Sequence, residues 1–231
     1  MVQREELEKE TKVFSRLTEE LVADLQPVKP VRLGLFYVFG AGVGLVAICL
    51  MLVVLGPRSD LAGQLGSSSF LAVLAALSFV AISSVVLAVR VSIPGRRINR
   101  LLALTVVVAP PVLALTVFLL SPWGGSWPGW DGIVMGFRKC TGSIVVTAAL
   151  PWAATVALLH RLAPFRYMLA GVFAGLSALT MGAVGLHFSC PVGNSFHLAF
   201  SHYLPLSVLS FAAGIPAAFL FRAMDGYRGQ R

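Results

Sequence analysis

Acidic residues are scarce in this sequence: it holds 10 Asp and Glu among 231 residues, and none of them falls inside the long apolar runs. Carboxylates within a membrane are the usual mark of proton relays and ion-coupled transport, so their lack argues against both. Charged residues make up only 12% of the chain, hydrophobic residues make up 57%, and mean hydropathy is +0.85. A water-soluble domain does not carry such a composition. The sequence therefore excludes a soluble globular enzyme and predicts an integral membrane protein.

Motifs of catalysis and nucleotide binding are also lacking. The sequence has no phosphate-binding glycine loop, no His-Glu-x-x-His pattern and no Gly-x-Ser-x-Gly elbow. We therefore expect no enzymatic activity, no catalytic residue and no resident cofactor. Three cysteines are too few for a disulfide scaffold, so each is interpreted from its position. Cys49 lies in the middle of an apolar run and is predicted to be a small buried side chain.

Six apolar segments each come close to the length of about 20 residues that a helix needs to cross a bilayer. The predicted fold is all-α: a polytopic membrane protein with six transmembrane helices, preceded by a cytoplasmic amphipathic helix. Its predicted parts are a tail at 1–32, a six-helix sensor domain at 33–221 and a C-terminal end at 222–231. The six predicted spans are Leu33–Gly56, Ser68–Val91, Leu101–Leu120, Cys140–His160, Tyr167–Phe188 and Leu198–Phe221.

Small residues follow one stripe of the fifth span, at Gly171, Gly175, Ala178 and Gly182. Such stripes let helix backbones approach each other closely inside a membrane. We interpret this stripe as a packing surface rather than a ligand site. Glycine stripes also permit a homodimer, so the oligomeric state stays open.

The positive residues predict how the chain is oriented. Of the 18 Lys and Arg, 15 fall on the side of the two termini, and only Arg58, Arg138 and Lys139 fall on the other side. Cytoplasmic loops are enriched in Lys and Arg, so both termini are predicted to be cytoplasmic. The net charge of +8 then reflects the excess of Lys and Arg in the cytoplasmic segments, and no direct contact with nucleic acid is expected.

Two cysteines and three histidines are predicted to share the outer edge of the bundle. Cys140 begins the fourth span and Cys190 follows the fifth, and sequential antiparallel spans bring such ends close together. A structural disulfide and a redox- or metal-responsive pair are both compatible with this placement. His187, His197 and His202 lie at the same edge, and thiolate with imidazole is a ligand set for soft metals. Their spacing matches no standard zinc motif, so interfacial hydrogen bonding competes with ligation as their role.

The N-terminal tail carries an apolar stripe with helical periodicity, which Pro27 and Pro30 end before the first span. The tail has six Lys and Arg against seven Asp and Glu, whereas helices that lie on the anionic inner leaflet are rich in Lys and Arg. The stripe is therefore predicted to bind a basic protein partner, and packing against the bundle is the alternative. Its residues are Leu7, Val13, Phe14, Leu17, Leu21, Val22 and Leu25.

Several short features occur together along the chain: a DLxPV stretch at 24–28, the six spans, Cys140 at the start of the fourth, and a Leu-His-x-x-Cys-Pro segment ending after Cys190. This joint layout resembles the NrsF-type membrane anti-sigma factors of bacteria over essentially the whole chain. The resemblance implies an inner-membrane protein whose tail holds an extracytoplasmic-function sigma factor inactive. It also implies that Cys140 and Cys190 sense stress, with a heavy-metal ion or an oxidant as the signal. The spacing of His187 from Cys190 departs from the family pattern.

Two other classes of function fit parts of the sequence. A small metal or metabolite transporter would use the Cys/His edge as the place where its substrate enters, and uptake into proteoliposomes that depends on Cys190 would favour it. A membrane redox enzyme would hold haem or quinone through histidines. One inner and three outer histidines do not pair in an obvious way across the bilayer.

Overall fold

The computed structural model describes residues 14–16, 18–20, 22–23, 32–120, 129–162 and 164–228, apart from the side chains of residues 120 and 226–228. Contacts divide the chain into two units, Met1–Arg32 and Leu33–Arg231, which are described separately below. Every regular element in the described ranges is a helix, which confirms the predicted all-α class.

Within the described residues of the second unit, six helical segments are long and apolar enough to cross a membrane, as the sequence predicts. Four of them are single helices, while the fourth and sixth segments each contain a π-helical turn. The elements are α2 (Leu33–Leu55), α3 (Leu61–Gln64), α4 (Ser68–Val91), α5 (Arg100–Leu120), α6 (Gly129–Gly136), η1 (Phe137–Thr141), α7 (Gly142–Leu159), η2 (His160–Leu162), α8 (Tyr167–Ser189), α9 (Ser195–Leu198), η3 (Ala199–Tyr203) and α10 (Leu204–Arg228).

The fourth span is longer than predicted, because it starts at Gly129 rather than at Cys140. The charged pair Arg138 and Lys139 ends the apolar run in the sequence, but the backbone stays helical through both residues. The longer bounds also bring one aspartate, Asp131, into the span. The prediction that the spans hold no acidic residue is therefore wrong at the helix ends.

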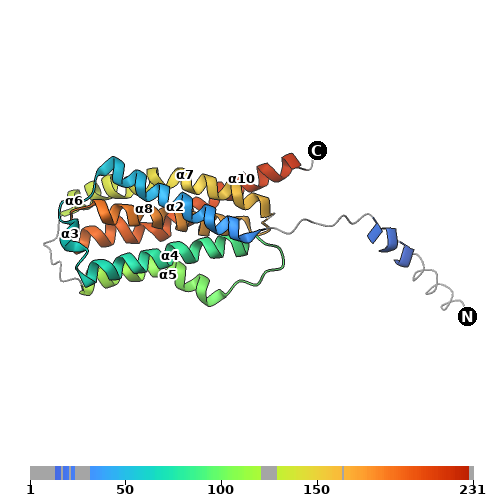
Figure 1. Ribbon diagram of the computed structural model, residues 1–231, viewed down its shortest axis with the longest axis horizontal. Coiled ribbons are helices and arrows are strands. Elements are labelled where there is room, and N and C mark those ends of the chain that lie inside the picture. Colours follow the sequence, from blue (N-terminus) through green and yellow to red (C-terminus); the bar gives the residue numbers. More distant parts are fainter. Residues whose placement is uncertain are drawn as a thin grey trace, which may run out of the picture. The chain divides into compact units, whose positions relative to one another are not determined.

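Helix α8 lies at the centre of the bundle, where it contacts α2, α4, α7 and α10 (Figure 1). Of the residues in the most apolar stretch of α8, 89% are buried, whereas the corresponding share in α2 is 17%. A Cβ atom placed on Gly171 would collide with the Cβ of Ala217, and one on Gly175 would lie 2.7 Å from the Cβ of Ala213. The predicted packing role of the glycine stripe is thus confirmed. Since α10 of the same chain covers these glycines, they offer no surface to a second copy.

Cys49 is exposed on α2, which corrects its predicted burial. The buried residues of α2 are Gly44, Ala47 and Met51, which lie on one face of the helix. Cys49 stands two residues from both Ala47 and Met51, and this offset of about 200° turns it to the opposite face. Burial could not be read from the sequence, because a helix that faces lipid is apolar all round.

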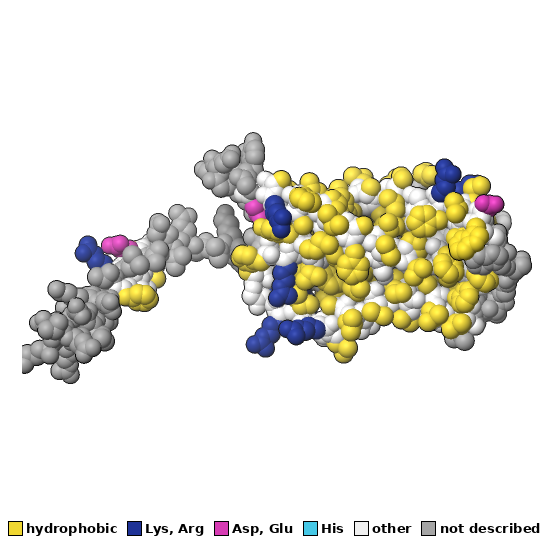
Figure 2. Space-filling view, turned by 180° about the vertical axis from the view of Figure 1, so that it is seen from behind, with side chains coloured by type: hydrophobic (Ala, Val, Ile, Leu, Met, Phe, Trp, Pro, Cys, Tyr) yellow, Lys and Arg dark blue, Asp and Glu magenta, His cyan; other side chains and the backbone are white. Residues whose placement is uncertain are grey.

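Hydrophobic side chains cover the middle of the second unit, while Lys and Arg gather toward its ends (Figure 2). Ile82 and Val146, for example, are 59% and 75% exposed although both lie well inside the spans Ser68–Val91 and Gly129–Leu162. A soluble protein would bury such residues, whereas lipid contact requires them at the surface. Below, the cysteine end is the end of the bundle with Cys140 and Cys190, and the arginine end is the one with residues 90–100.

At the arginine end, Asp225 joins the end of α10 to η2 and α8. Its Oδ1 lies 2.9 Å from Nε2 of His160, and its Oδ2 accepts a hydrogen bond from the Tyr167 hydroxyl. The rings of His160 and Tyr167 both stack with Phe221. One carboxylate therefore connects α10, η2 and α8 at this end of the bundle.

Candidate functional site

Four side chains with metal-ligating or nucleophilic atoms meet at the cysteine end: Cys140, Cys190, His197 and His202. Each offers one ligand atom, and all four atoms lie within 4.8 Å of one another. They come from η1, from the C-cap of α8, from α9 and from η3. The structure thus brings together both predicted sensing cysteines and two of the three predicted histidines.

His197 lies between the two thiols. Its Nε2 is 3.4 Å from Sγ of Cys140 and 3.5 Å from Sγ of Cys190, and both cysteines are free. Hydrogen bonding from the Cys140 thiol, with further help from His197, lowers the pKa of the Cys190 thiol against the opposing effect of burial. A lowered pKa favours the thiolate, which is the form that attacks oxidants and binds metals.

The third predicted histidine, His187, lies outside this cluster. Its ring stacks on Phe70 with a centroid distance of 4.2 Å, and its Nε2 is 3.3 Å from the Phe70 carbonyl oxygen. Phe70 of α4 therefore contacts the His187 ring twice: its own ring covers one face, and its carbonyl oxygen pairs with Nε2. The cluster therefore includes four of the five residues that the sequence predicts as possible metal ligands.

Two π-helical turns present ligands to the cluster. Cys140 lies in η1 and His202 in η3. A π turn places one extra residue in the helix and shifts the side chains that follow it, and such turns are frequent at functional sites. The Thr141 hydroxyl donates a hydrogen bond to the Ser201 carbonyl oxygen at 2.6 Å, which joins the two turns directly.

Asn194 and Gly136 fix the position of His197. Asn194 caps α9, because its Oδ1 accepts hydrogen bonds from the backbone N–H groups of Phe196 at 2.9 Å and His197 at 3.4 Å. A Cβ atom on Gly136 would lie 2.7 Å from Nδ1 of His197, so only glycine leaves room for the ring. Sequence reasoning missed both residues. Asparagine before a helix is a known capping signal that could have identified Asn194, whereas nothing in the sequence marks Gly136.

Replacing Asn194 by alanine is expected to loosen α9 and expose the thiols. Loss of such a cap costs about 1 kcal/mol, so the Cys190 thiol should react about fivefold faster with a maleimide in the purified protein. Asn194→Asp keeps an accepting oxygen and should react at the wild-type rate. If the alanine and aspartate variants were labelled equally fast, Asn194 would have no part in holding the site.

The connection between α2 and α4 covers the cluster near Cys190. The backbone N–H of Arg58 donates to the Phe188 carbonyl oxygen at 2.9 Å, and its guanidinium pairs with the Asp60 carboxylate at 2.6 and 2.8 Å. The hydrogen bond from Arg58 lowers the pKa of Asp60 to about 2, so the pair stays ionised at physiological pH. A cavity of about 40 Å³ lies beneath, lined in part by Arg58, His187 and Cys190.

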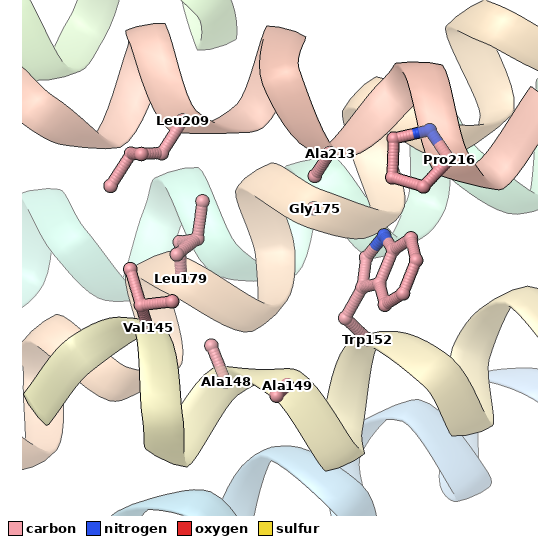
Figure 3. A pocket seen from close by; sticks show the side chains of 9 residues that line it. All are labelled: Val145, Ala148, Ala149, Trp152, Gly175, Leu179, Leu209, Ala213 and Pro216. Atoms are coloured by element: carbon pink, nitrogen blue, oxygen red, sulfur yellow. The ribbon is translucent and has the colours of Figure 1, made fainter. Parts of the chain in front are cut away.

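An apolar hollow of about 240 Å³ lies elsewhere in the bundle, between α7, α8 and α10 (Figure 3). Trp152 from α7, Gly175 from α8 and Pro216 from α10 all border it. The residues that line it include no titratable group. The hollow supplies no reactive group, which leaves the cysteine end as the candidate functional site.

Two residues of the predicted tail stripe, Phe14 and Val22, lie in the described part of the first unit. Both are helical, and they are 74% and 58% exposed. The Thr18 hydroxyl donates to the Phe14 carbonyl oxygen, and Arg16 pairs with Glu20 at 3.4 Å, both with the i,i+4 spacing of a helix. Five other stripe residues lie outside the described residues: Leu7, Val13, Leu17, Leu21 and Leu25.

Fold and site together define a six-span helical membrane protein whose reactive groups are thiols and imidazoles gathered at one end. The sequence profile of the NrsF family, described as negative regulator of sigma F, matches residues 21–222. The chain therefore belongs to this family, and the resemblance seen in the sequence is confirmed. No curated protein and no solved structure gives a match. Family membership makes negative regulation the role and a sigma factor the partner.

Proposed function

We propose that this chain is a membrane-bound anti-sigma factor of the bacterial inner membrane. Its N-terminal helix holds an extracytoplasmic-function sigma factor and releases it when Cys140 and Cys190 sense a heavy metal or an oxidant. The observation that carries the proposal is the exposure of the apolar residues Phe14 and Val22 in a unit of its own. An exposed apolar helix face is the means by which a helix binds a groove on a partner. Such sequestration needs no catalysis.

The distribution of charge supports cytoplasmic termini. At the arginine end, a hollow of about 740 Å³ is lined by four arginines, Arg96, Arg97, Arg100 and Arg166. Positive residues gather on the cytoplasmic side of a membrane protein. The cysteine end then faces the oxidising compartment, where thiols meet oxidants and metal ions first.

The thiol pair has the chemistry that oxidant sensing requires. The sulfur atoms of Cys140 and Cys190 lie within 4.8 Å of each other, so they must approach by at most about 2.8 Å to reach the S–S bond length of about 2.0 Å. On oxidation both S–H bonds break and one S–S bond forms. Hydrogen peroxide takes up the two electrons and two protons and leaves as two water molecules. The bond would join the end of α8 to η1 and so change the packing of two spans.

A paired substitution in the tail tests the sequestration step. Leu17→Asp with Leu21→Asp places two charges on the apolar stripe, and the loss of even one buried leucine contact, worth about 1.5–3 kcal/mol, lowers affinity at least about tenfold. We expect the co-purified sigma factor to fall by at least that factor, while the membrane unit unfolds at an unchanged temperature. Glu19→Ala with Glu20→Ala changes the polar face and is the matched control. Undiminished capture by the aspartate variant would refute the proposal.

A further inference from the structure

We propose that Cys140, Cys190, His197 and His202 together form a four-coordinate site for a soft or borderline divalent cation of the zinc and cadmium class. The proposed function treats the two cysteines as the sensor, and this inference adds two histidine ligands and a coordination geometry. The inference rests on the proposed function only in assigning metal binding a role in regulation. The site itself rests on the arrangement of the four side chains.

The distances between the ligand atoms suit tetrahedral coordination. Bond lengths of about 2.3 Å to sulfur and 2.0–2.1 Å to nitrogen place the ligand atoms of a tetrahedral zinc site roughly 3.3–3.8 Å apart. Nε2 of His197 already lies 3.4 and 3.5 Å from the two sulfur atoms. The full set lies within 4.8 Å, so a contraction of about 1 Å completes the site.

His202 supplies an independent sign that a ligand is needed. The side chain is fully buried, yet neither Nδ1 nor Nε2 has a hydrogen-bond partner among the described residues. A buried polar group without a partner costs about 1–3 kcal/mol, and native structures keep few of them. Its ring meets the ring of His197 edge to face, at a centroid distance of 5.0 Å. Coordination of a cation would give His202 the partner that the protein does not provide.

Charge balance selects the kind of ion. When both thiols bind M²⁺, two protons leave and two thiolates cancel the charge of the ion, so a neutral complex remains at the edge of the membrane. The set contains no carboxylate, which disfavours calcium and magnesium, and it contains two soft sulfur ligands, which favour zinc or cadmium. Four protein ligands leave no open position, as in structural rather than catalytic sites.

The approach to the site is compatible with a cation. The cavity of about 40 Å³ that borders Cys190 has room for a single ion or water molecule. Arg58 also lines it, but its guanidinium is paired with Asp60 and so repels an incoming cation less than a free arginine would. Once bound, the ion would join η1, the end of α8, α9 and η3, and would thereby hold three spans in one arrangement.

The test uses the full-length reduced protein in detergent micelles, with no sigma factor present. Cobalt should give the visible absorption of a tetrahedral thiolate site, cadmium should give a thiolate charge-transfer band, and zinc should displace cobalt at one ion per chain. His197→Gln and His202→Gln should each weaken zinc binding on the order of 100-fold, the loss expected for at least a supporting ligand. Gly136→Ala, which removes no ligand but presses on the His197 ring, should weaken it as well.

Two control variants separate this site from other sources of binding. His160→Gln changes a buried histidine at the arginine end and Cys49→Ser changes the third cysteine, and both should bind zinc as the wild type does. Binding that needs the two cysteines but is unaffected by either histidine variant would overturn the four-ligand site, as would a lack of stoichiometric zinc binding. Neither result touches sigma-factor capture, which the tail variants measure separately.

Discussion

Replacing Gly171 by leucine is expected to destabilise the bundle by about 3 kcal/mol or more, the upper end of what overpacking costs. Already the first atom of a side chain at this position would collide with the Cβ of Ala217 and lie 3.0 Å from the Cα of Gly214. These are atoms at or next to the backbone of α10, so no flexible side chain can turn away. The two helices would have to separate, and the purified variant should unfold at a markedly lower temperature in micelles.

Gly42→Leu is the matched control for this experiment. Gly42 is exposed on α2, and a Cβ atom there would have no neighbour within 4 Å. Leucine is also a better helix former than glycine, so this variant should be as stable as the wild type or more stable by up to about 1 kcal/mol. If both leucine variants unfolded at the same temperature, close contact between α8 and α10 would not be what holds the bundle together.

Asp225→Leu is expected to cost about 1–3 kcal/mol, because it leaves the buried His160 imidazole and the Tyr167 hydroxyl without their shared acceptor. The side chain of Asp225 is 35% exposed, and water therefore makes good part of the loss. Denaturant unfolding in mixed micelles should show a lower midpoint. The end of α10 should also become more sensitive to proteases.

Asp131→Leu removes the same charge at the other end of the bundle and serves as the control. Asp131 is exposed in the first turn of α6, so its replacement should change stability by no more than about 0.5 kcal/mol. Equal losses in the two variants would mean that the effect came from charge or from the added hydrophobic surface. The pairing of Asp225 with His160 and Tyr167 would then have little weight.

The number of spans could be predicted from the sequence because the thickness of a bilayer sets the length of the apolar segment that each spanning helix needs. Which face of each span meets protein could not be predicted, because lipid and protein interior are equally apolar to a helix. Cys49 shows this limit, since it lies on the exposed side of α2. The glycines of α8 were the exception, because close helix contact demands small residues and so leaves a pattern.

The sequence predicted at which end of the bundle the candidate site lies, but not which residues come into contact there. Cys140 and Cys190 were expected together because antiparallel neighbours share their ends. The exclusion of His187 depends on Phe70, which lies 117 residues away in the chain. Likewise a π-helical turn is a shift in backbone hydrogen bonding that no residue pattern announces, so the turns that aim Cys140 and His202 became visible only in three dimensions.

Helix α2 stands between the two parts of the proposed signal, since the tail continues directly into Leu33 at its first residue. Gly185 of α8 lies five residues before Cys190 in the chain. A Cβ atom on Gly185 would lie 2.8 Å from the Cβ of Met51, so the C-terminal part of α2 packs closely against the helix that precedes Cys190. Helix α2 also contacts α7 and α4, but only 17% of the residues in its most apolar stretch are buried. Under the proposed function, a displacement of α8 at the thiols would therefore reach α2 through this close contact, and α2 is the helix that directly follows the N-terminal tail in the chain.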